Sequence, residues 1–137
     1  MAVKDEFKLH LYYLSKLIVK YPKILVYGPY GEGKSTLFES LKLKYPDVNF
    51  YPGGENDIKE PFVYGINSPE DFFIPKFDRI YCVQYSTEYK ESRTGVSFNE
   101  WRPMIDYVEK AKYIKQGKRN LSGKVFGSLA ELKKAIE

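Results

Sequence analysis

KILVYGPYGEGKSTLFESLKL, residues 23–43, combines three signals that together predict the fold. The run 23–27 is short and apolar, which is typical of a buried parallel strand. Residues 34–44 repeat apolar side chains at helical spacing and end before Pro46. Between them, Gly28 is followed by four variable residues and then by Gly33, Lys34 and Ser35. A strand, a glycine-rich turn and a helix in this order indicate an α/β domain.

The spacing of this turn resembles the phosphate-binding loop of nucleotide-binding proteins. Glycines let the backbone turn its N–H groups inward, and the following helix presents its positive end to an anion. Lys34 would reach the β- and γ-phosphates, Ser35 would ligate Mg²⁺, and Thr36 would contact the α-phosphate. A chance match in an ordinary turn is the alternative. The motif predicts binding of ATP or GTP with Mg²⁺ by Gly28, Pro29, Tyr30, Gly31, Glu32, Gly33, Lys34, Ser35 and Thr36.

The remaining elements follow from periodicity and from turn signals. Strands are expected at 23–27, 48–51, 62–66, 79–85 and 123–127. Helices are expected at 4–20, within an N-terminal segment 1–22, and at 34–44, 98–115 and 128–136. Ser68, Pro69 and Glu70 have the pattern of a cap that opens one further short helix before Pro75. Alternating strands and helices predict a three-layer α/β domain with a parallel sheet and an extra N-terminal helix.

Composition favours one globular domain over residues 1–137, with 43% hydrophobic residues and no low-complexity tract. No apolar run is long enough for a membrane span or a signal peptide, so the cytoplasm is the expected compartment. The single cysteine, Cys82, excludes an intramolecular disulfide and a cysteine metal site. It lies within an apolar run, which predicts a buried thiol with no catalytic role.

The formal net charge is +4, and the excess of basic residues is concentrated in residues 110–124. Such a patch is a candidate surface for nucleic acid. The alternative interpretation is a solvated helix face and loop, because no nucleic-acid-binding motif accompanies the charges. The basic residues of this segment are Lys110, Lys112, Lys115, Lys118, Arg119 and Lys124.

Two further stretches, FDRIYCVQYSTEYKESRTGVSFNEW at 77–101 and SGKVFGSLAELKKAIE at 122–137, resemble nucleotide and nucleoside kinases with a phosphate-binding loop. That group includes adenylate kinase and dephospho-coenzyme A kinase. The resemblance implies five parallel strands in the order 2-3-1-4-5, and a lid-like segment at 86–97. It also implies that Arg93 approaches the transferring phosphoryl group, with Arg102 as a second candidate. Two solvated surface arginines are the alternative.

The chain departs from this resemblance at the end of the third expected strand. Enzymes with a phosphate-binding loop usually place there an acid that orients Mg²⁺, whereas FVYGIN ends in Asn67. Glu70 and Asp71 follow in the expected short helix, and Glu55 and Asp57 follow the second expected strand. Asp57 is the preferred substitute, because kinases of this group often carry functional acids after the second strand. A solvated loop acid is the alternative.

Three functions are consistent with these residues. The first is a kinase-like enzyme that moves the γ-phosphoryl group to a small acceptor, with Lys34, Arg93 and Asp57 as its catalytic residues. The second is an ATPase that acts on nucleic acid through residues 110–124, or in an assembly formed through the N-terminal helix. The third is a module that binds nucleotide with little turnover. The uncharged amide of Asn67 predicts slow intrinsic hydrolysis in each case.

Overall fold

The computed structural model describes residues 6–28, 34–71, 73–85 and 121–137. Within these ranges its helices are α1 (Glu6–Lys20), α2 (Lys34–Lys44) and α6 (Leu129–Ile136). Its strands are β1 (Lys23–Tyr27), β2 (Asn49–Tyr51), β3 (Phe62–Ile66), β4 (Arg79–Cys82) and β5 (Val125–Phe126). The expected segment 86–97 and helix 98–115 lie outside the described residues.

The five strands form one sheet in the order β2-β3-β1-β4-β5, so the predicted order is confirmed. β1 lies at the centre and pairs in parallel with β3 on one side and with β4 on the other. Tyr27, the last residue of β1, pairs with Ile66 of β3 and with Cys82 of β4. The carboxyl ends of three neighbouring strands therefore meet at one edge of the sheet.

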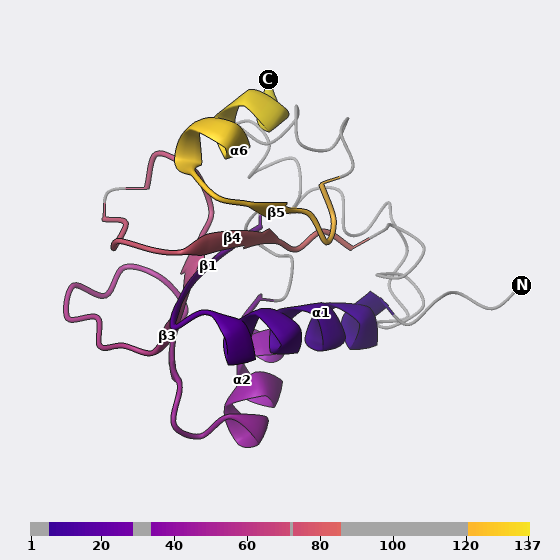
Figure 1. Ribbon diagram of the computed structural model, residues 1–137, viewed down its shortest axis with the longest axis vertical. Coiled ribbons are helices and arrows are strands. Elements are labelled where there is room, and N and C mark those ends of the chain that lie inside the picture. Colours follow the sequence, from indigo (N-terminus) through magenta and orange to yellow (C-terminus); the bar gives the residue numbers. More distant parts are fainter. Residues whose placement is uncertain (1–5, 29–33, 72, 86–120) are drawn as a thin grey trace, which may run out of the picture.

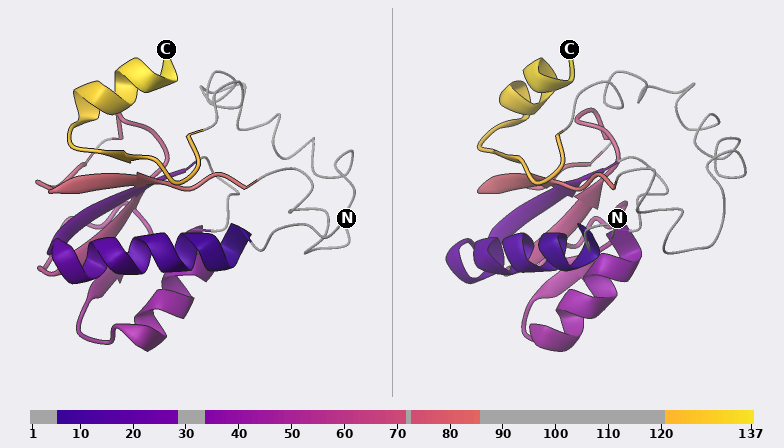
Figure 2. Two further views of the ribbon diagram at one scale, coloured as in Figure 1. Left: turned by 45° about the vertical axis from the view of Figure 1, so that its right-hand side comes forward. Right: turned by 90° about the vertical axis from the view of Figure 1, so that its right-hand side faces the viewer.

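Helices cover both faces of the sheet, with α1 and α2 on one face and α6 on the other (Figures 1 and 2). Side chains of β1 alternate between these layers, as a strand requires. Ile24 and Val26 pack in the cluster below α1 and α2, and Leu25 and Tyr27 pack in the cluster below α6. None of the described helices is long and apolar enough to cross a bilayer.

The prediction of an all-parallel sheet is wrong at its last strand, because β5 pairs with β4 in the antiparallel direction. The chain returns at the carboxyl end of β4, where Leu121 N–H donates to Gln84 Oε1 at 3.2 Å. Gly123 N–H then donates to the carbonyl of Cys82 at 2.9 Å, and β5 runs back along β4. A parallel β5 would require the chain to re-enter at the opposite edge.

The short helix expected after Ser68 is also wrong, because the described residues 67–71 form a turn. Ser68 Oγ accepts from Glu70 N–H at 3.1 Å, and the Ser68 carbonyl accepts from Asp71 N–H at 3.2 Å. These hydrogen bonds are the same as those that cap the start of a helix, but here they stabilise a turn. Phe73 and Ile74 then pack against the core below α6. The strands expected at 79–85 and 123–127 are shorter than predicted, and they cover Arg79–Cys82 and Val125–Phe126.

Two glycines let the chain pass close over β3 as it leaves β2. A Cβ atom at Gly65 would lie 2.7 Å from the carbonyl oxygen of Pro52, and one at Gly53 would lie 2.8 Å from the carbonyl oxygen of Gly65. Gly53 also has φ +132°, a backbone conformation that favours glycine. The segment 53–60 can therefore turn tightly at the edge where β2 and β3 end.

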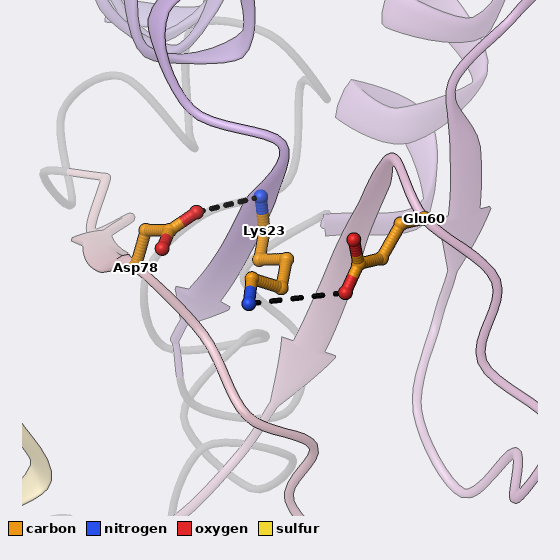
Figure 3. A network of polar contacts seen from close by, with 3 residues as sticks. All are labelled: Lys23, Glu60 and Asp78. Carbon is orange, nitrogen blue, oxygen red and sulfur yellow. Dashed lines mark hydrogen bonds and ion pairs between the residues drawn. The ribbon is translucent and has the colours of Figure 1, made fainter.

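Contacts of Lys23, the first residue of β1, fix the end of the sheet at which the parallel strands begin (Figure 3). Its main-chain N–H donates to Asp78 Oδ2 at 3.2 Å, and its carbonyl accepts from Asp78 N–H at 2.8 Å. Its ammonium lies 3.8 Å from Glu60 Oε1, an ion pair at the surface that contributes little to stability. The main-chain bonds fix the start of β1 beside the segment that leads into β4.

A buried polar cluster attaches α1 to β4. His10 is 3% exposed, and its Nδ1 lies 2.7 Å from the Tyr81 hydroxyl, while its Nε2 lies 3.3 Å from Ser122 Oγ. The Ser122 hydroxyl donates its single proton to the Gln84 carbonyl at 2.7 Å, so Ser122 Oγ accepts from Nε2–H of His10. Nδ1 of the neutral imidazole then accepts from the Tyr81 hydroxyl, whose pKa is raised by burial. One neutral tautomer of His10, with its proton on Nε2, therefore accounts for the contacts of both ring nitrogens.

Substitution of Gly65 by alanine should destabilise the fold, because the new Cβ atom would meet the Pro52 carbonyl at 2.7 Å. We expect a loss of about 1–3 kcal/mol in the free energy of unfolding, measured by urea denaturation. Gly127→Ala is the matched control, since the nearest atom to its Cβ would be Glu131 Oε2 at 3.7 Å. Equal stability of the two variants would contradict the close approach at β3.

The pH dependence of stability should report on His10, the single histidine of the chain. Burial lowers the pKa of His10 below its ordinary value of 6.5, outweighing the opposing effects of the Gln84 carbonyl and Glu6. The unfolded chain therefore binds the proton first, and the free energy of unfolding falls as the pH drops below about 6.5. Urea denaturation between pH 7 and pH 5 measures this loss. His10→Gln, which does not titrate, should flatten the profile, and an unchanged slope would contradict the assignment.

Candidate functional site

The side chain of Lys34 lies where the carboxyl ends of β1 and β3 meet. Lys34 is the first residue of α2, and its Nζ donates to the Gly28 carbonyl at 2.6 Å and to the Ile66 carbonyl at 3.0 Å. It also donates to Asn67 Oδ1. The same Ile66 carbonyl accepts from Gly28 N–H at 3.2 Å, which continues the β1–β3 pairing past Tyr27. These contacts hold the Lys34 ammonium at the carboxyl end of the central strand β1, beside the end of β3.

The local sequence explains why Lys34 lies at the end of β1. The apolar run 23–27 is buried in the sheet, so the chain must leave the sheet at Gly28. α2 then begins at Lys34 and buries Leu37, Phe38 and Leu41 against the sheet. The first turn of an α-helix has N–H groups without an intrahelical partner, and its dipole favours an anion. The start of α2 therefore combines a primary ammonium with a helix N-terminus.

Ser35 and Thr36 follow Lys34 in the first turn of α2, and both are exposed. Both side chains are thus accessible to solvent at the start of α2, and their roles with Mg²⁺ and phosphate stay predictions. Residues 29–33 of the predicted loop lie outside the described residues, as do Arg93 and Arg102. The roles given to these residues stay predictions.

The turn 67–71 carries an acid that sequence reasoning assigned to a helix. Asp71 Oδ2 accepts from the main-chain N–H of Asn67 at 2.9 Å. Asn67 in turn accepts from the ammonium of Lys34 through its side chain. A carboxylate is therefore connected to Lys34 through one intervening residue. Serine and aspartate favour such side-chain bonds to nearby main-chain groups both in turns and at helix starts, so the sequence did not distinguish the two.

Asp57, the acid preferred from the sequence, lies in the segment 53–60 that connects β2 to β3. Gly54 N–H of this segment donates to the Tyr64 hydroxyl at 2.8 Å, and Lys59 N–H donates to the Tyr51 hydroxyl at 3.1 Å. Both tyrosines belong to the cluster below α6, on the face of the sheet opposite α2. Asp57 is exposed, and none of these contacts directs it toward Lys34.

Glu55, the other acid after β2, is turned toward its own backbone. The Gly53 N–H lies 3.2 Å from both carboxylate oxygens of Glu55. Within the described ranges, no three side chains of histidine, cysteine, aspartate or glutamate gather as a metal centre would require. Among the described residues, Ser35 is the one that the sequence motif predicts to be a ligand of Mg²⁺.

Cys82 of β4 and His10 of α1 are both buried, away from solvent. Burial raises the pKa of Cys82 to about 12, so its thiol is protonated at neutral pH and is a poor nucleophile. This agrees with the predicted buried thiol, and Cys82 is fully buried below α6. His10 is enclosed by Tyr81, Tyr85 and Ser122, and sequence reasoning missed this cluster, whose members are far apart in the chain.

An open hollow of about 170 Å³ lies beside the same edge of the sheet. Tyr27 at the end of β1 and residues 68–70 of the turn form one side of it. Lys133, Ile136 and Glu137 of the C-terminal segment form the other side. The hollow lies toward α6, and its described lining includes neither Gly28 nor Lys34 nor Asn67.

Comparisons of the chain with protein-family models, with curated proteins and with solved structures find no match. The function is therefore inferred from the residues of the site.

Proposed function

We propose that this chain binds a nucleoside triphosphate, ATP or GTP, with Mg²⁺ and transfers its γ-phosphoryl group to a small acceptor. The main observation behind this proposal is the position of the Lys34 ammonium, which donates to the Gly28 and Ile66 carbonyls where the ends of β1 and β3 meet. The glycine spacing at 28–33 and the start of α2 support the same function. The strand order that the resemblance to nucleotide and nucleoside kinases implies also supports it, although β5 is antiparallel.

The described residues fit a phosphate chain by their chemistry. Lys34 supplies a cation at a helix N-terminus, and the hydroxyl groups of Ser35 and Thr36 follow it in the same turn. Ser35 would hold Mg²⁺, which when bound neutralises charge on the phosphate oxygens. Lys34 would neutralise the charge that develops between the β- and γ-phosphates. Phosphoryl transfer depends mainly on positioning and electrostatics, so few protein groups are needed.

Slow turnover in the absence of an acceptor belongs to this proposal. Asn67 occupies the position where related enzymes place an acid, and its amide oxygen contacts Lys34. A neutral amide orients a metal-bound water less firmly than a carboxylate, because hydrogen bonds to ionised groups are about twice as strong. We infer that the site binds nucleotide and needs an acceptor or a partner for faster transfer. A lid-side role for Arg93 remains part of the proposal.

Action on nucleic acid is not favoured by an observation within the described residues. Of the basic segment 110–124, only residues 121–124 are described, and Lys124 is exposed. Self-association has a more specific basis. Leu9, Tyr12, Tyr13 and Val19 of α1 are exposed by 41, 55, 47 and 74%. These four residues form an apolar stripe on the solvent side of this helix, interrupted by exposed Lys16, whose Nζ lies 4.4 Å from the centre of the Tyr12 ring. We propose this side of α1 as the contact between copies of the chain.

Substitution of Lys34 by alanine should weaken nucleotide binding strongly, because the variant loses the cation at the start of α2. We expect the Kd of a fluorescent ATP analogue to rise about tenfold to a hundredfold. Lys42→Ala is the matched control, since Lys42 is exposed in the last turn of the same helix. Equal affinities of wild type and the Lys34 variant would show that the loop assignment is wrong.

Acceptor-dependent release of ADP or GDP completes this test. Wild type is incubated with the triphosphate and Mg²⁺, together with nucleosides and nucleoside monophosphates in turn. A rate that rises with one acceptor, and is lost in the Lys34→Ala variant, supports phosphoryl transfer. Nucleotide binding without acceptor-dependent release would favour the module with little turnover.

Self-association through α1 should be sensitive to charge on its apolar stripe. Val19→Lys should shift a concentration-dependent dimer to monomer in sedimentation equilibrium, because lysine opposes burial of this face. Leu43→Lys is the control, since Leu43 is exposed by 88% but lies on α2. A wild-type chain that stays monomeric at high concentration would exclude this contact.

A further inference from the structure

Within the part of the chain that the structure describes, three oxygens accept from the ammonium of Lys34, and they differ in their freedom to move. The carbonyls of Gly28 and Ile66 belong to the main chain at the ends of β1 and β3. The Ile66 carbonyl also accepts from Gly28 N–H, so it is part of the sheet pairing. Asn67 contributes a side-chain oxygen, which can turn away without any change in the sheet. Of the three acceptors, Asn67 is therefore the one that a ligand can replace.

The main chain at Asn67 is fixed although its side chain can turn. Asp71 Oδ2 accepts from Asn67 N–H at 2.9 Å, and Asp71 N–H donates to the Ser68 carbonyl at 3.2 Å. The bond to a carboxylate is of the stronger, charge-assisted kind. Asp71 thereby keeps the Asn67 backbone beside the ammonium, and the amide can return to Lys34 after it has left.

We propose that Asn67 is a latch on Lys34, positioned by Asp71, and that the phosphates of the bound nucleotide displace it. This inference rests on the proposed function. An ammonium has three N–H groups, and the described residues alone place three oxygens within hydrogen-bonding distance of the Lys34 Nζ. A phosphate oxygen that takes one of these N–H groups must replace one acceptor, and Asn67 is the one that can move. The latched lysine lowers the apparent affinity for nucleotide, because binding must first open the latch.

The latch makes a prediction opposite to that for a metal-orienting residue. Removing the amide in Asn67→Ala should lower the Kd of a fluorescent ATP analogue by about three- to tenfold, since phosphate no longer competes with it. The decrease should occur both with Mg²⁺ and with EDTA. Asn56→Ala is the matched control, because Asn56 is exposed in the segment 53–60. A Kd equal to or above that of wild type overturns the latch.

The isosteric variant Asn67→Asp tests the same contact with a stronger partner. A carboxylate in place of the amide would form an ion pair with Lys34, so the Kd should rise by about tenfold under both conditions. Tighter binding that appears only with Mg²⁺ would overturn the latch, because it would indicate an acid that orients the metal. Circular dichroism of each variant, compared with wild type, confirms that the fold is retained.

Asp71 is a positioning residue in this proposal, and a double-mutant cycle separates that role from a general effect on the turn. Asp71→Asn should lower the Kd by about two- to threefold, while exposed Asp47→Asn should leave it unchanged. In the Asn67→Ala background, Asp71→Asn should have no further effect, because there is no amide left to position. Additive effects of the two substitutions would remove Asp71 from the latch.

The Lys34→Ala variant distinguishes failure of the latch from failure of the proposed function. If Lys34→Ala binds the analogue as tightly as wild type, nucleotide binding through this lysine is wrong, and the latch is wrong with it. If Lys34→Ala weakens binding and Asn67→Ala does not strengthen it, the latch alone is overturned.

Discussion

The parallel pairing of β1 with β3 is the constraint on which the rest of the structure depends. Residues 24–27 and 62–66 of the two strands are buried, and their register runs from Lys23 beside Phe62 to Tyr27 beside Ile66. This register places the carbonyls of Gly28 and Ile66 at one point of the sheet edge. A slip of one residue would turn the side chains of β3 to the wrong face and would separate these two carbonyls. The position of Lys34 therefore depends on the core as much as on its own loop.

Local signals predicted the centre of the fold well. The helix expected at 34–44 has the observed bounds, and the strands expected at 23–27 and 62–66 have theirs. These segments are long or strongly apolar, so their pattern decides their structure. The direction of β5 was not predictable in this way, since its pairing depends on bonds of Gly123 and Lys124 to Cys82, about forty residues earlier. The strand itself has two residues, Val125 and Phe126, and no periodicity that shows its direction.

The site was predictable in part. Lys34 was selected from motif spacing, and the structure places its ammonium where the carboxyl ends of β1 and β3 meet. The sequence did not predict the contact between Asp71 and Asn67. Ser68, Pro69 and Glu70 can begin either a helix or a turn, because the same hydrogen bonds form in both. The burial of Phe73 and Ile74 below α6 is a tertiary effect that a single sequence does not show. An acid was therefore sought at the strand end or after β2, although one is held four residues beyond Asn67.

The contacts of Lys34 divide the site into a fixed part and a mobile part. The sheet holds the Ile66 carbonyl, which accepts from Gly28 N–H, and the Gly28 carbonyl follows the last residue of β1 in the main chain. Asp71 holds the backbone of Asn67 by a charge-assisted bond, so the amide alone can turn. An aspartate at position 67 would bind the ammonium more strongly and would make its release more costly. A neutral amide at the lysine, with the charge moved to Asp71, is thus the arrangement that keeps Lys34 in place and still allows it to change partners.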